Sequence, residues 1–463
     1  MKPTLRPPSA AAVTGGAAAL WGLAIGLRPL GDNSALTHLA TGRLILDHGV
    51  PSGDPFSFSA PGTAWTVSSW LASVGMALAE RVNEAHGVLL ARTVVTTALA
   101  VLAWRLTRPA GTLAGRIIAV SVVLVLGSGG WPERPLLLGL LFLATVAVVV
   151  EDDRRRPWLV APVMWLWVNV HGSFPLGVVY LVARLAGRKL DGEPAGRLRT
   201  VTLAAGAGTL AGAINPVGPR LLTFPFHLLG RHDLLARVVE WRSPTFSEPP
   251  NLFFLAAVLL AVALAGRRRS WEDGLVAAAF GTAACLGQRN LTLAAVALAP
   301  VLARGLSGLG TVEGRERNRA TAVAAMALGV VAVTLVASSL QRNAYDLTKY
   351  PVRQLAWMED QGLFDGRVAT QDFVGNLVML REGPGPHVFF DDRYDMYPRQ
   401  VIRDAVALLD GDEGWQRRLD TYRIDAVLWE RSRPLAGLLA LDPGWRIVRK
   451  DKDWVVALRT PPT

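Results

Sequence analysis

Cysteine is almost absent from the chain, since Cys285 is the single one among 463 residues. One cysteine excludes a disulfide bond within the chain and any zinc site built from several cysteines. Charged residues are also scarce, at 18% of the chain, against roughly 25% in soluble domains. A chain with so little charge and 51% hydrophobic residues is predicted to lie largely in a membrane.

Several familiar motifs are missing as well. The sequence holds no phosphate-binding glycine loop, no Walker motif and no Ser-His-Asp set, and it shows no repeats and no low-complexity tail. The N-terminus has a basic start and an apolar run, but Arg28-Pro29 stands where a small-residue cleavage site would follow. We therefore expect this run to be retained as the first membrane span.

Apolar runs recur along most of the chain and predict an α-helical polytopic membrane protein with about eleven transmembrane helices. Several runs are shorter than the ~20 residues that a full crossing needs. A weaker run over residues 68–80 is placed outside the membrane as an interfacial or re-entrant helix, because another span there would spoil the charge pattern. The expected spans cover approximately residues 11–29, 88–106, 115–130, 135–150, 158–170, 174–187, 199–213, 251–265, 273–287, 291–305 and 320–339.

The net charge of +11 at first suggests a nucleic-acid partner. The basic residues instead cluster in alternate short loops between apolar runs, for example at Arg154–Arg156 and Arg267–Arg269. This is the pattern of cytoplasmic loops in membrane proteins and not a nucleic-acid patch, so no nucleic acid is expected. An odd number of spans then puts the N-terminus in the cytoplasm and the tail outside the cytoplasmic membrane.

The composition changes near residue 340, where apolar runs shorten and acidic residues appear. We predict a transmembrane helical domain over residues 1–340, with an outer loop at 31–87, and a small extracytoplasmic α/β domain over 341–463. In this second domain the pattern predicts strands at 388–390, 426–429, 445–448 and 455–458, and helices at 351–361, 398–409 and 432–440.

The outer loop begins with Asp32, at the start of a helix predicted over residues 34–48 and ended by Gly49. One interpretation of Asp32 is a helix cap, because short polar side chains accept hydrogen bonds from the free N–H groups of the first turn. The other is a general base that takes a proton from an acceptor hydroxyl. The two roles are not exclusive.

Asp54 lies in an Asp-Pro turn of the same loop. It is either an ordinary turn residue or a second acidic residue of the site. If Asp32 and Asp54 face one pocket, they could bind a divalent cation through oxygen ligands. No other cofactor is expected.

Polar side chains at the outer ends of the spans are the next candidates, because polar groups at bilayer depth are costly and often functional. Arg289 either extends into the lipid headgroups or clamps a lipid-linked phosphate, for which the guanidinium fork is suited. Arg134 is a second candidate for that role. Glu240 and Trp241 could hold a sugar, or Trp241 could anchor the chain at the membrane interface.

Further candidates carry weaker signals. Asp392 and Arg393 follow a predicted strand, where α/β sheets usually place ligands, although a solvated loop with an Arg-Asp pair explains them equally well. The lone histidines His38 and His171 fit packing or hydrogen bonding as well as substrate binding. The set of substrate-binding candidates is His38, Arg43, Arg134, His171, Glu240, Trp241, Arg289, Asn290, Asp392 and Arg393.

The layout resembles the GT-C class of membrane glycosyltransferases, and in particular a bacterial GT-C-like branch. The resemblance covers nearly the full chain in layout, but its motifs are short. They are Asp32 after the first span, Thr37–Arg43, Val50–Phe58, Trp165-x-Trp167-x-Asn169-x-His171-Gly172, Glu240-Trp241-x-Ser243-Pro244, Arg289-Asn290 and Asp391–Tyr397.

Enzymes of this class typically use a polyprenyl-phosphate sugar donor and an acidic residue in the first outer loop as base. The resemblance therefore implies Asp32 as the base, Asp54 as a second acidic residue and Arg289 as a phosphate contact. The sequence departs from the class where Asn33-Ser34-Ala35 follows Asp32, because no second carboxylate stands nearby.

The expected function is an inverting transfer of a sugar from a polyprenyl-phosphate donor to an envelope glycan or protein on the outer membrane face. A transporter or flippase of lipid-linked solutes is one alternative, and a non-catalytic envelope scaffold is another. The transporter would need charged residues deep in the spans and paired halves, whereas the polar groups lie mostly at span ends.

Overall fold

The computed structural model describes residues 6–231, 239–311 and 313–461. The chain divides into two compact units, each assembled from two stretches of sequence. Unit 1 comprises Met1–Leu30 and Ala79–Ala344, and unit 2 comprises Gly31–Leu78 and Tyr345–Thr463. Most of the outer loop predicted at residues 31–87 therefore belongs to the same compact unit as the C-terminal residues.

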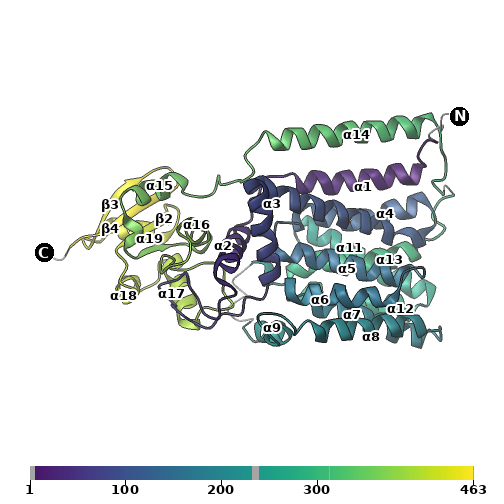
Figure 1. Cartoon of the computed structure of the whole chain (residues 1–463), viewed down its shortest axis with the longest axis horizontal. Coiled ribbons are helices and arrows are strands. Elements are labelled where there is room, and N and C mark those ends of the chain that lie inside the picture. The colour runs from purple at the N-terminus through teal and green to yellow at the C-terminus, as the bar shows by residue number, and fades with distance from the viewer. Residues whose placement is uncertain (1–5, 232–238, 312, 462–463) are drawn as a thin grey trace. The chain divides into compact units, whose positions relative to one another are not determined.

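Unit 1 is a bundle of long α-helices lying roughly parallel and antiparallel to one another (Figure 1). Short 3-10 helices at η1 (Arg108–Ala110), η2 (Pro157–Leu159), η3 (Val239–Trp241) and η4 (Gln288–Asn290) connect some of them. The bundle helices are α1 (Ala10–Gly26), α3 (Trp70–Leu106), α4 (Leu113–Gly130), α5 (Pro135–Glu151), α6 (Val160–Val170), α7 (Phe174–Leu190), α8 (Gly196–Ala211), α11 (Pro249–Arg268), α12 (Trp271–Leu286), α13 (Leu291–Gly305) and α14 (Arg319–Leu340). The shorter α9 (Arg220–Leu229) lies across them in Figure 1, and the first residues of α3 belong to unit 2.

A helix occupies each of the eleven apolar runs predicted as spans, but the expectation of eleven full crossings is not supported. Among the described residues, four helical segments are long and apolar enough to cross a membrane: Trp70–Ala110, Leu113–Gly130, Pro249–Arg268 and Arg319–Leu340. The other runs form shorter or less apolar helices, such as the 11 residues of α6, against the ~20 residues of a full span. The weaker run at 68–80 begins α3, whose backbone leaves helical geometry at Asn83 and Glu84.

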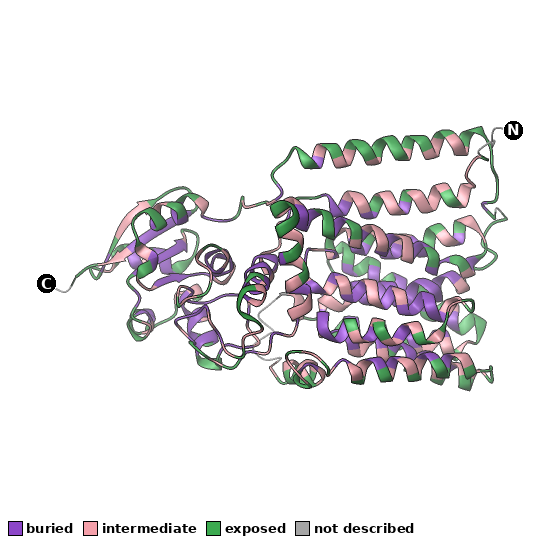
Figure 2. Ribbon diagram, viewed as in Figure 1, coloured by how far each residue is buried: buried purple, intermediate pink, exposed green. Residues whose placement is uncertain are grey.

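The core of unit 1 is α13, in which every residue from Leu291 to Ala303 is buried. Small residues let other helices approach closely, as transmembrane helix packing commonly requires. A methyl group added to Gly208 in α8 would overlap the carbonyl of Ala161 in α6. In contrast, α14 exposes Val323, Val330 and other apolar side chains along most of its length (Figure 2).

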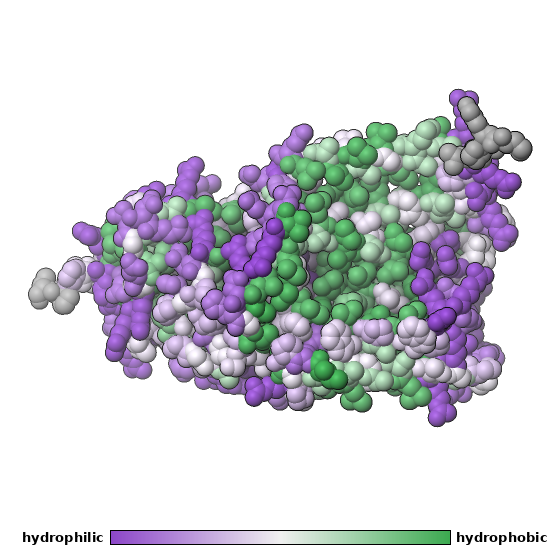
Figure 3. All heavy atoms as spheres, in the orientation of Figure 1, coloured by the Kyte–Doolittle hydropathy of each residue, from purple (hydrophilic) through white to green (hydrophobic). Residues whose placement is uncertain are grey.

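The surface of unit 1 separates apolar from polar residues. In Figure 3 the bundle helices present mainly apolar residues, and hydrophilic residues gather at the end of the bundle near the N-terminus. This end carries the arginine-rich loops after α3, α5 and α11. A broad apolar band ended by charged loops is the surface expected of a protein embedded in a bilayer.

Unit 2 combines a four-stranded mixed sheet with helices. The strand order is β1-β2-β4-β3, with β1 parallel to β2 and the other pairs antiparallel. Its helix α2 packs against α16. The elements are α2 (Asn33–His48), α15 (Val352–Asp360), η5 (Leu363–Asp365), β1 (Val368–Thr370), α16 (Asp372–Glu382), α17 (Arg399–Asp410), α18 (Trp415–Thr421), β2 (Ala426–Glu430), α19 (Pro434–Leu441), β3 (Trp445–Lys450) and β4 (Trp454–Arg459).

The predicted strands at 426–429, 445–448 and 455–458 are confirmed, but the strand at 388–390 is wrong. Val388 makes only an isolated bridge to Ser57. The first strand is instead β1, which is three residues long and too short to show a period of two. The three predicted helices of this region are present, and the sequence pattern missed α16 and α18.

Candidate functional site

Asp32 in unit 2 is the N-cap of α2. Its backbone is extended, and a side-chain oxygen accepts a hydrogen bond of 2.9 Å from the N–H of Ser34. Gly49 ends the helix with φ of 84°, a conformation that glycine adopts without strain. The capping role predicted for Asp32 is therefore present, and the half-buried carboxylate stands at the positive end of the helix dipole.

Asp392 joins the start of α2 to the C-terminal part of unit 2. Its two oxygens accept hydrogen bonds of 2.6 Å from Ser34 Oγ and 2.7 Å from Thr37 Oγ1. Its backbone N–H donates to Asn376 Oδ1 of α16 at 3.1 Å. These contacts engage the carboxylate of a residue that was one of the substrate-binding candidates, and they hold the first turn of α2 in place.

Asp54 and Arg393 form a buried cluster with Asp391 and Tyr397. Arg393 donates from Nη1 to Asp54 at 2.7 Å, and from Nε and Nη2 to Asp391 at 2.9 and 2.6 Å. The Tyr397 hydroxyl donates to Asp391 at 2.9 Å. The Arg393 side chain is 4% exposed and both carboxylates are fully enclosed. Burial alone would lower the pKa of Arg393, but Asp391 and Asp54 outweigh burial and raise it.

The hydrogen-bonding capacity of Asp54 is taken up within unit 2. Besides Arg393, its oxygens accept from the backbone N–H groups of Phe56 and Ser57, each at 3.1 Å, and from the Ser57 hydroxyl. Such a turn with a paired carboxylate fits the turn interpretation of Asp54 and leaves no free oxygen for a substrate. His38 lies 2.9 Å from Ser73 Oγ, and Arg43 donates to the carbonyl of Leu380 at 3.3 Å.

Unit 1 brings together four of the other candidates at one end of its helices. Arg134 forms an ion pair with Glu240. The next residue, Trp241, carries the Arg289 guanidinium stacked on its ring, with 3.5 Å between the guanidinium carbon and the ring centroid. We call these residues the Glu240–Trp241 cluster: Arg134, Glu240, Trp241 and Arg289.

Arg289 is the member of the cluster with spare hydrogen-bonding capacity. Within the described part of the chain its guanidinium makes no hydrogen bond or ion pair. It is held by the cation–π stack on Trp241. Burial lowers the pKa of Arg289 to about 10, partly opposed by Glu240, so the group stays charged at neutral pH. The adjacent Asn290 instead donates to the carbonyl of Ala283 at 2.8 Å and fixes the turn of η4.

The sequence reasoning missed Arg92, which is buried in α3 beside this end of the bundle. Arg92 forms an ion pair with Glu133, and it donates to the Gly26 carbonyl at 3.1 and 2.8 Å from Nε and Nη2. It thereby binds a free carbonyl at the end of α1. Arg92 lies well inside the apolar run 88–106, and a charged residue at such a position was the signal that could have revealed it.

His171 takes part in a local network at the start of α7. Its Nδ1 lies 2.8 Å from Ser173 Oγ, and Trp167 Nε1 donates to the same hydroxyl at 3.0 Å. These contacts favour the hydrogen-bonding interpretation of His171. They do not join it to Arg289 or Trp241.

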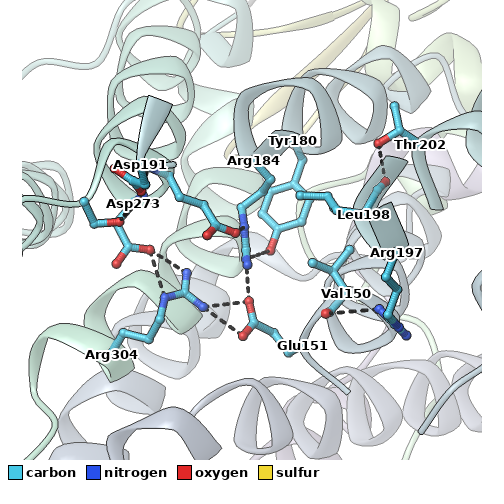
Figure 4. A network of polar contacts seen from close by, with 12 residues as sticks. Val150, Glu151, Tyr180, Arg184, Asp191, Arg197, Leu198, Thr202, Asp273 and Arg304 are labelled. Atoms are coloured by element: carbon cyan, nitrogen blue, oxygen red, sulfur yellow. Dashed lines mark hydrogen bonds and ion pairs between the residues drawn. The ribbon is translucent and has the colours of Figure 1, made fainter. Parts of the chain in front are cut away.

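The opposite end of unit 1 holds a second ionic network, which no candidate residue predicted. Glu151 at the end of α5 accepts from Arg304 at 2.7 and 2.8 Å and from Arg184 (Figure 4). Arg184 also binds Glu272, and Arg304 also binds Asp273 at 2.6 Å. Each arginine thus lies between two carboxylates, and the network ties α5, α7, α12 and α13 together.

Solved structures of low sequence identity share the fold of most of this chain. The oligosaccharyltransferase of Archaeoglobus fulgidus in its apo form is 12% identical and matches 90% of this chain and 69% of its own, with a TM-score of 0.59. The archaeal oligosaccharyltransferase AglB, in complex with an inhibitory peptide and a dolichol-phosphate, matches with the same coverage and a TM-score of 0.52. No protein-family model and no curated protein matches the sequence.

The chain has the GT-C fold. The fold prediction made from the first outer loop and the order of apolar runs is thereby confirmed, although 12% identity says nothing about individual site residues.

A divalent cation was also expected, and a third GT-C structure, from Archaeoglobus fulgidus at a TM-score of 0.52, is a complex with Zn and sulfate. Among the described residues of this chain, no three His, Cys, Asp or Glu side chains gather as a metal site. Asp54 and Asp391 are bound to Arg393, and Asp392 is bound to two hydroxyls. Asp54, one of the two expected ligands beside Asp32, is therefore already engaged by a cation, and no step of the proposed reaction depends on a divalent ion.

Proposed function

We propose that the chain is a membrane glycosyltransferase that moves a sugar or glycan from a polyprenyl-phosphate donor to an envelope glycan or protein on the outer membrane face. The GT-C fold carries this proposal, because the matched structures are oligosaccharyltransferases and one is a complex with a dolichol-phosphate and a peptide. A lipid-linked donor also suits a bundle in which four of the described helices are long and apolar enough to cross a bilayer.

The donor phosphate is assigned to Arg289. Its guanidinium is held flat by Trp241 and keeps its hydrogen-bond donors available, as described above. A planar cation of this kind binds two phosphate oxygens at once and favours the negative charge that develops when a phosphate leaves. Arg134 is already paired with Glu240, so its role is to hold Glu240 beside the stack.

Asp32 is assigned the role of base. An acceptor hydroxyl or amide would lose its proton to the Asp32 carboxylate while its oxygen or nitrogen attacks the anomeric carbon. The bond between that carbon and the phosphate oxygen would break, and the lipid phosphate would leave with the electron pair. Attack opposite to the leaving group inverts the configuration at the anomeric carbon. Asp54, enclosed by Arg393, is assigned a structural role in this proposal.

The substitution Asp32→Asn distinguishes the two roles of Asp32, as general base and as N-cap of α2. Asparagine caps a helix about as well as aspartate, so α2 should keep its start while the base is lost. We expect transfer from a polyprenyl-phosphate sugar to fall by about 10²–10⁴-fold, as for loss of a general base. The matched control is Asp451→Asn, which makes the same change at a unit 2 turn where Asp451 accepts from two backbone N–H groups.

Membranes with the wild-type chain, D32N or D451N would be given the labelled donor and envelope acceptors. Wild-type rates in D32N would remove Asp32 from the role of base. Movement of the donor across the bilayer without product, in wild type and D32N alike, would favour the transporter alternative. The transporter and scaffold alternatives stay predictions.

A second arm tests Arg289. Arg289→Lys keeps the charge but loses the planar fork and the stack on Trp241. We expect KM for the donor to rise by about tenfold, the value of one charge-assisted hydrogen bond. Arg267→Lys, at an exposed position of the last turn of α11, is the control with the same chemical change. An unchanged KM in R289K would exclude Arg289 as the phosphate contact.

A further inference from the structure

A cavity of about 430 Å³ lies at the end of unit 1 that carries the arginine-rich loops, away from the Glu240–Trp241 cluster. It is bounded on one side by the end of α3 and by η1, and on the other by the end of α5 and the loop that follows it. Arginines contribute to both walls: Arg105 and Arg108 on the first, and Arg154 and Arg155 on the second. Its volume falls in the range of pockets that hold small ligands.

Three of these arginines are available to a ligand. In the described part of the chain, the guanidinium groups of Arg105, Arg108 and Arg154 make no hydrogen bond or ion pair. The fourth, Arg155, lies 3.5 Å from the Asp152 carboxylate, and its enclosed Nε donates no hydrogen bond. The cavity thus concentrates cationic groups whose donors are unused.

Three carboxylates lie on the cavity wall, but they do not neutralise Arg105 and Arg108. Asp152 lies 3.5 Å from Arg155 and accepts a hydrogen bond of 3.2 Å from the backbone N–H of Arg154. Glu151 is bound to Arg304 and Arg184 in the ionic network of Figure 4. The Asp153 side chain is 91% exposed and lies 3.5 Å from Arg197. Water therefore screens Asp153, and Glu151 is neutralised by two cations before any ligand enters.

The backbone of the second wall is fixed by Arg197 from α8. Its Nη2 donates to the carbonyls of Val149, Asp152 and Arg155 at 2.8, 2.9 and 2.9 Å. The free carbonyls at the end of α5 would otherwise present negative charge to the cavity. Arg197 donates hydrogen bonds to these carbonyls and holds the loop that carries Arg154. The cavity wall therefore presents less negative charge to an anion.

We propose that this cavity binds a phosphate group, carried either by the headgroup of an anionic phospholipid or by a free phosphate compound. Guanidinium forks match phosphate oxygens in geometry and charge. Basic pockets at the cytoplasmic ends of membrane helices are suited to anionic lipid headgroups, and the arginine-rich loops predict that this end faces the cytoplasm. The proposal is independent of the transferase activity, because it concerns a different end of the helices.

The test measures binding by the purified full chain in detergent micelles. The probes are dioleoyl phosphatidic acid, dioleoyl phosphatidylglycerol, dioleoyl phosphatidylcholine and inorganic phosphate, each read as a shift in the thermal unfolding midpoint and as a bound mass. The variant is R105Q/R108Q/R154Q. The control is R199Q/R267Q/R269Q, which removes the same charge from exposed arginines at the same end of the helices.

We expect the wild type and the control to bind an anionic probe, and R105Q/R108Q/R154Q to bind it about tenfold or more weakly, since each charge-assisted hydrogen bond is worth at least that factor. Binding of the two anionic lipids but not of inorganic phosphate identifies the lipid source, and the reverse identifies a free phosphate. Equal affinity of both triple variants, or equal binding of phosphatidylcholine, would overturn the proposal. If the triple variant does not fold, R154Q alone against R269Q gives the same comparison.

Discussion

Two arginine sites at opposite ends of the unit 1 helices use their hydrogen-bond donors in opposite ways. Arg184 and Arg304 each lie between two carboxylates, and the network joins four helices (Figure 4). At the other end Arg289 rests on the face of Trp241 and makes no ion pair among the described residues. The first arrangement directs donors of both arginines to carboxylates, whereas the second leaves the Arg289 donors without a partner among the described residues.

This difference separates structural arginines from candidate binding arginines within one unit. A buried cation whose donors are all used holds helices together, and removal of a partner exposes an uncompensated charge. A cation held by an aromatic ring is positioned at lower cost and keeps its hydrogen bonds for another molecule. The predictions that follow test this distinction. They run from the ionic network around Glu151, where the largest loss of stability is expected, to Asp191 at the start of α12, where the smallest is expected.

The largest effect is expected from Glu151→Gln. The change leaves Arg184 and Arg304 facing each other without the shared carboxylate, at a cost of about 3–5 kcal/mol in unfolding free energy. Denaturant unfolding in detergent measures this loss. Glu193→Gln, at an exposed position after α7, should change the midpoint little. If E151Q and E193Q unfold alike, the network does not hold the helices together.

The second largest effect is expected in unit 2, where Arg393 is buried between Asp54 and Asp391. Arg393→Met keeps much of the side-chain volume but leaves Asp54 and Asp391 enclosed without their cation. We expect the free energy of unfolding to fall by about 3 kcal/mol, the lower end of the range for a broken buried ion pair. The loss is limited because one carboxylate can take up a proton, which relieves the repulsion between the two. Unfolding as a function of pH should show R393M recovering stability as the pH falls, which the wild type should not. A pH-independent difference would contradict this account.

The sequence was most informative where a local pattern decides the structure. Asp32, Ser34 and Gly49 specify the start and end of α2 through capping chemistry alone. Each of the eleven apolar runs predicted from the sequence is a helix in unit 1. The same reasoning could not find the Asp54–Arg393 pair, because 339 residues separate the partners and the pairing is a property of the folded unit.

Pairing within the fold is what the sequence could not show. Asp392 and Arg393 were candidates because they follow a predicted strand, and Asp54 was a candidate second acidic residue. In the structure all three side chains contact neighbours within unit 2. Polarity in a loop cannot distinguish a satisfied side chain from a free one. Arg289 and Trp241 were candidates because they lie at the outer ends of the predicted spans, and only their contacts show that the Arg289 guanidinium has its donors available.

A smaller effect is expected from Trp241→Leu. Loss of the stacked ring should cost about 1 kcal/mol of stability, the size of a partly enclosed cation–π contact. Arg289 would then sample several positions, so donor affinity should fall more than stability does. Trp158→Leu is the control, because Trp158 is 55% exposed and its contact with Arg156 is 6.0 Å from the ring centroid. Equal donor affinity in W241L and W158L would contradict the assignment of the stack to binding.

The smallest effect is expected at Asp191, the residue after α7. Its carboxylate caps α12 by accepting hydrogen bonds from the backbone N–H groups of Trp271 and Glu272, and Glu272 belongs to the ionic network of Figure 4. Burial slightly raises its pKa, but the N–H groups of Glu272 and Trp271 outweigh burial and lower that pKa below the ordinary 3.8. Because the folded pKa is lowered, the carboxylate stabilises the fold above about pH 4, and this contribution is lost as the pH falls through the folded pKa. The residue is half-buried and its carboxylate is in contact with water, so solvent screening keeps the effect below about 1 kcal/mol. Asp191→Asn keeps a cap without the charge. Its stability relative to wild type should therefore rise between about pH 5 and about pH 3, and a constant difference over that range would show that the charge contributes nothing to the cap.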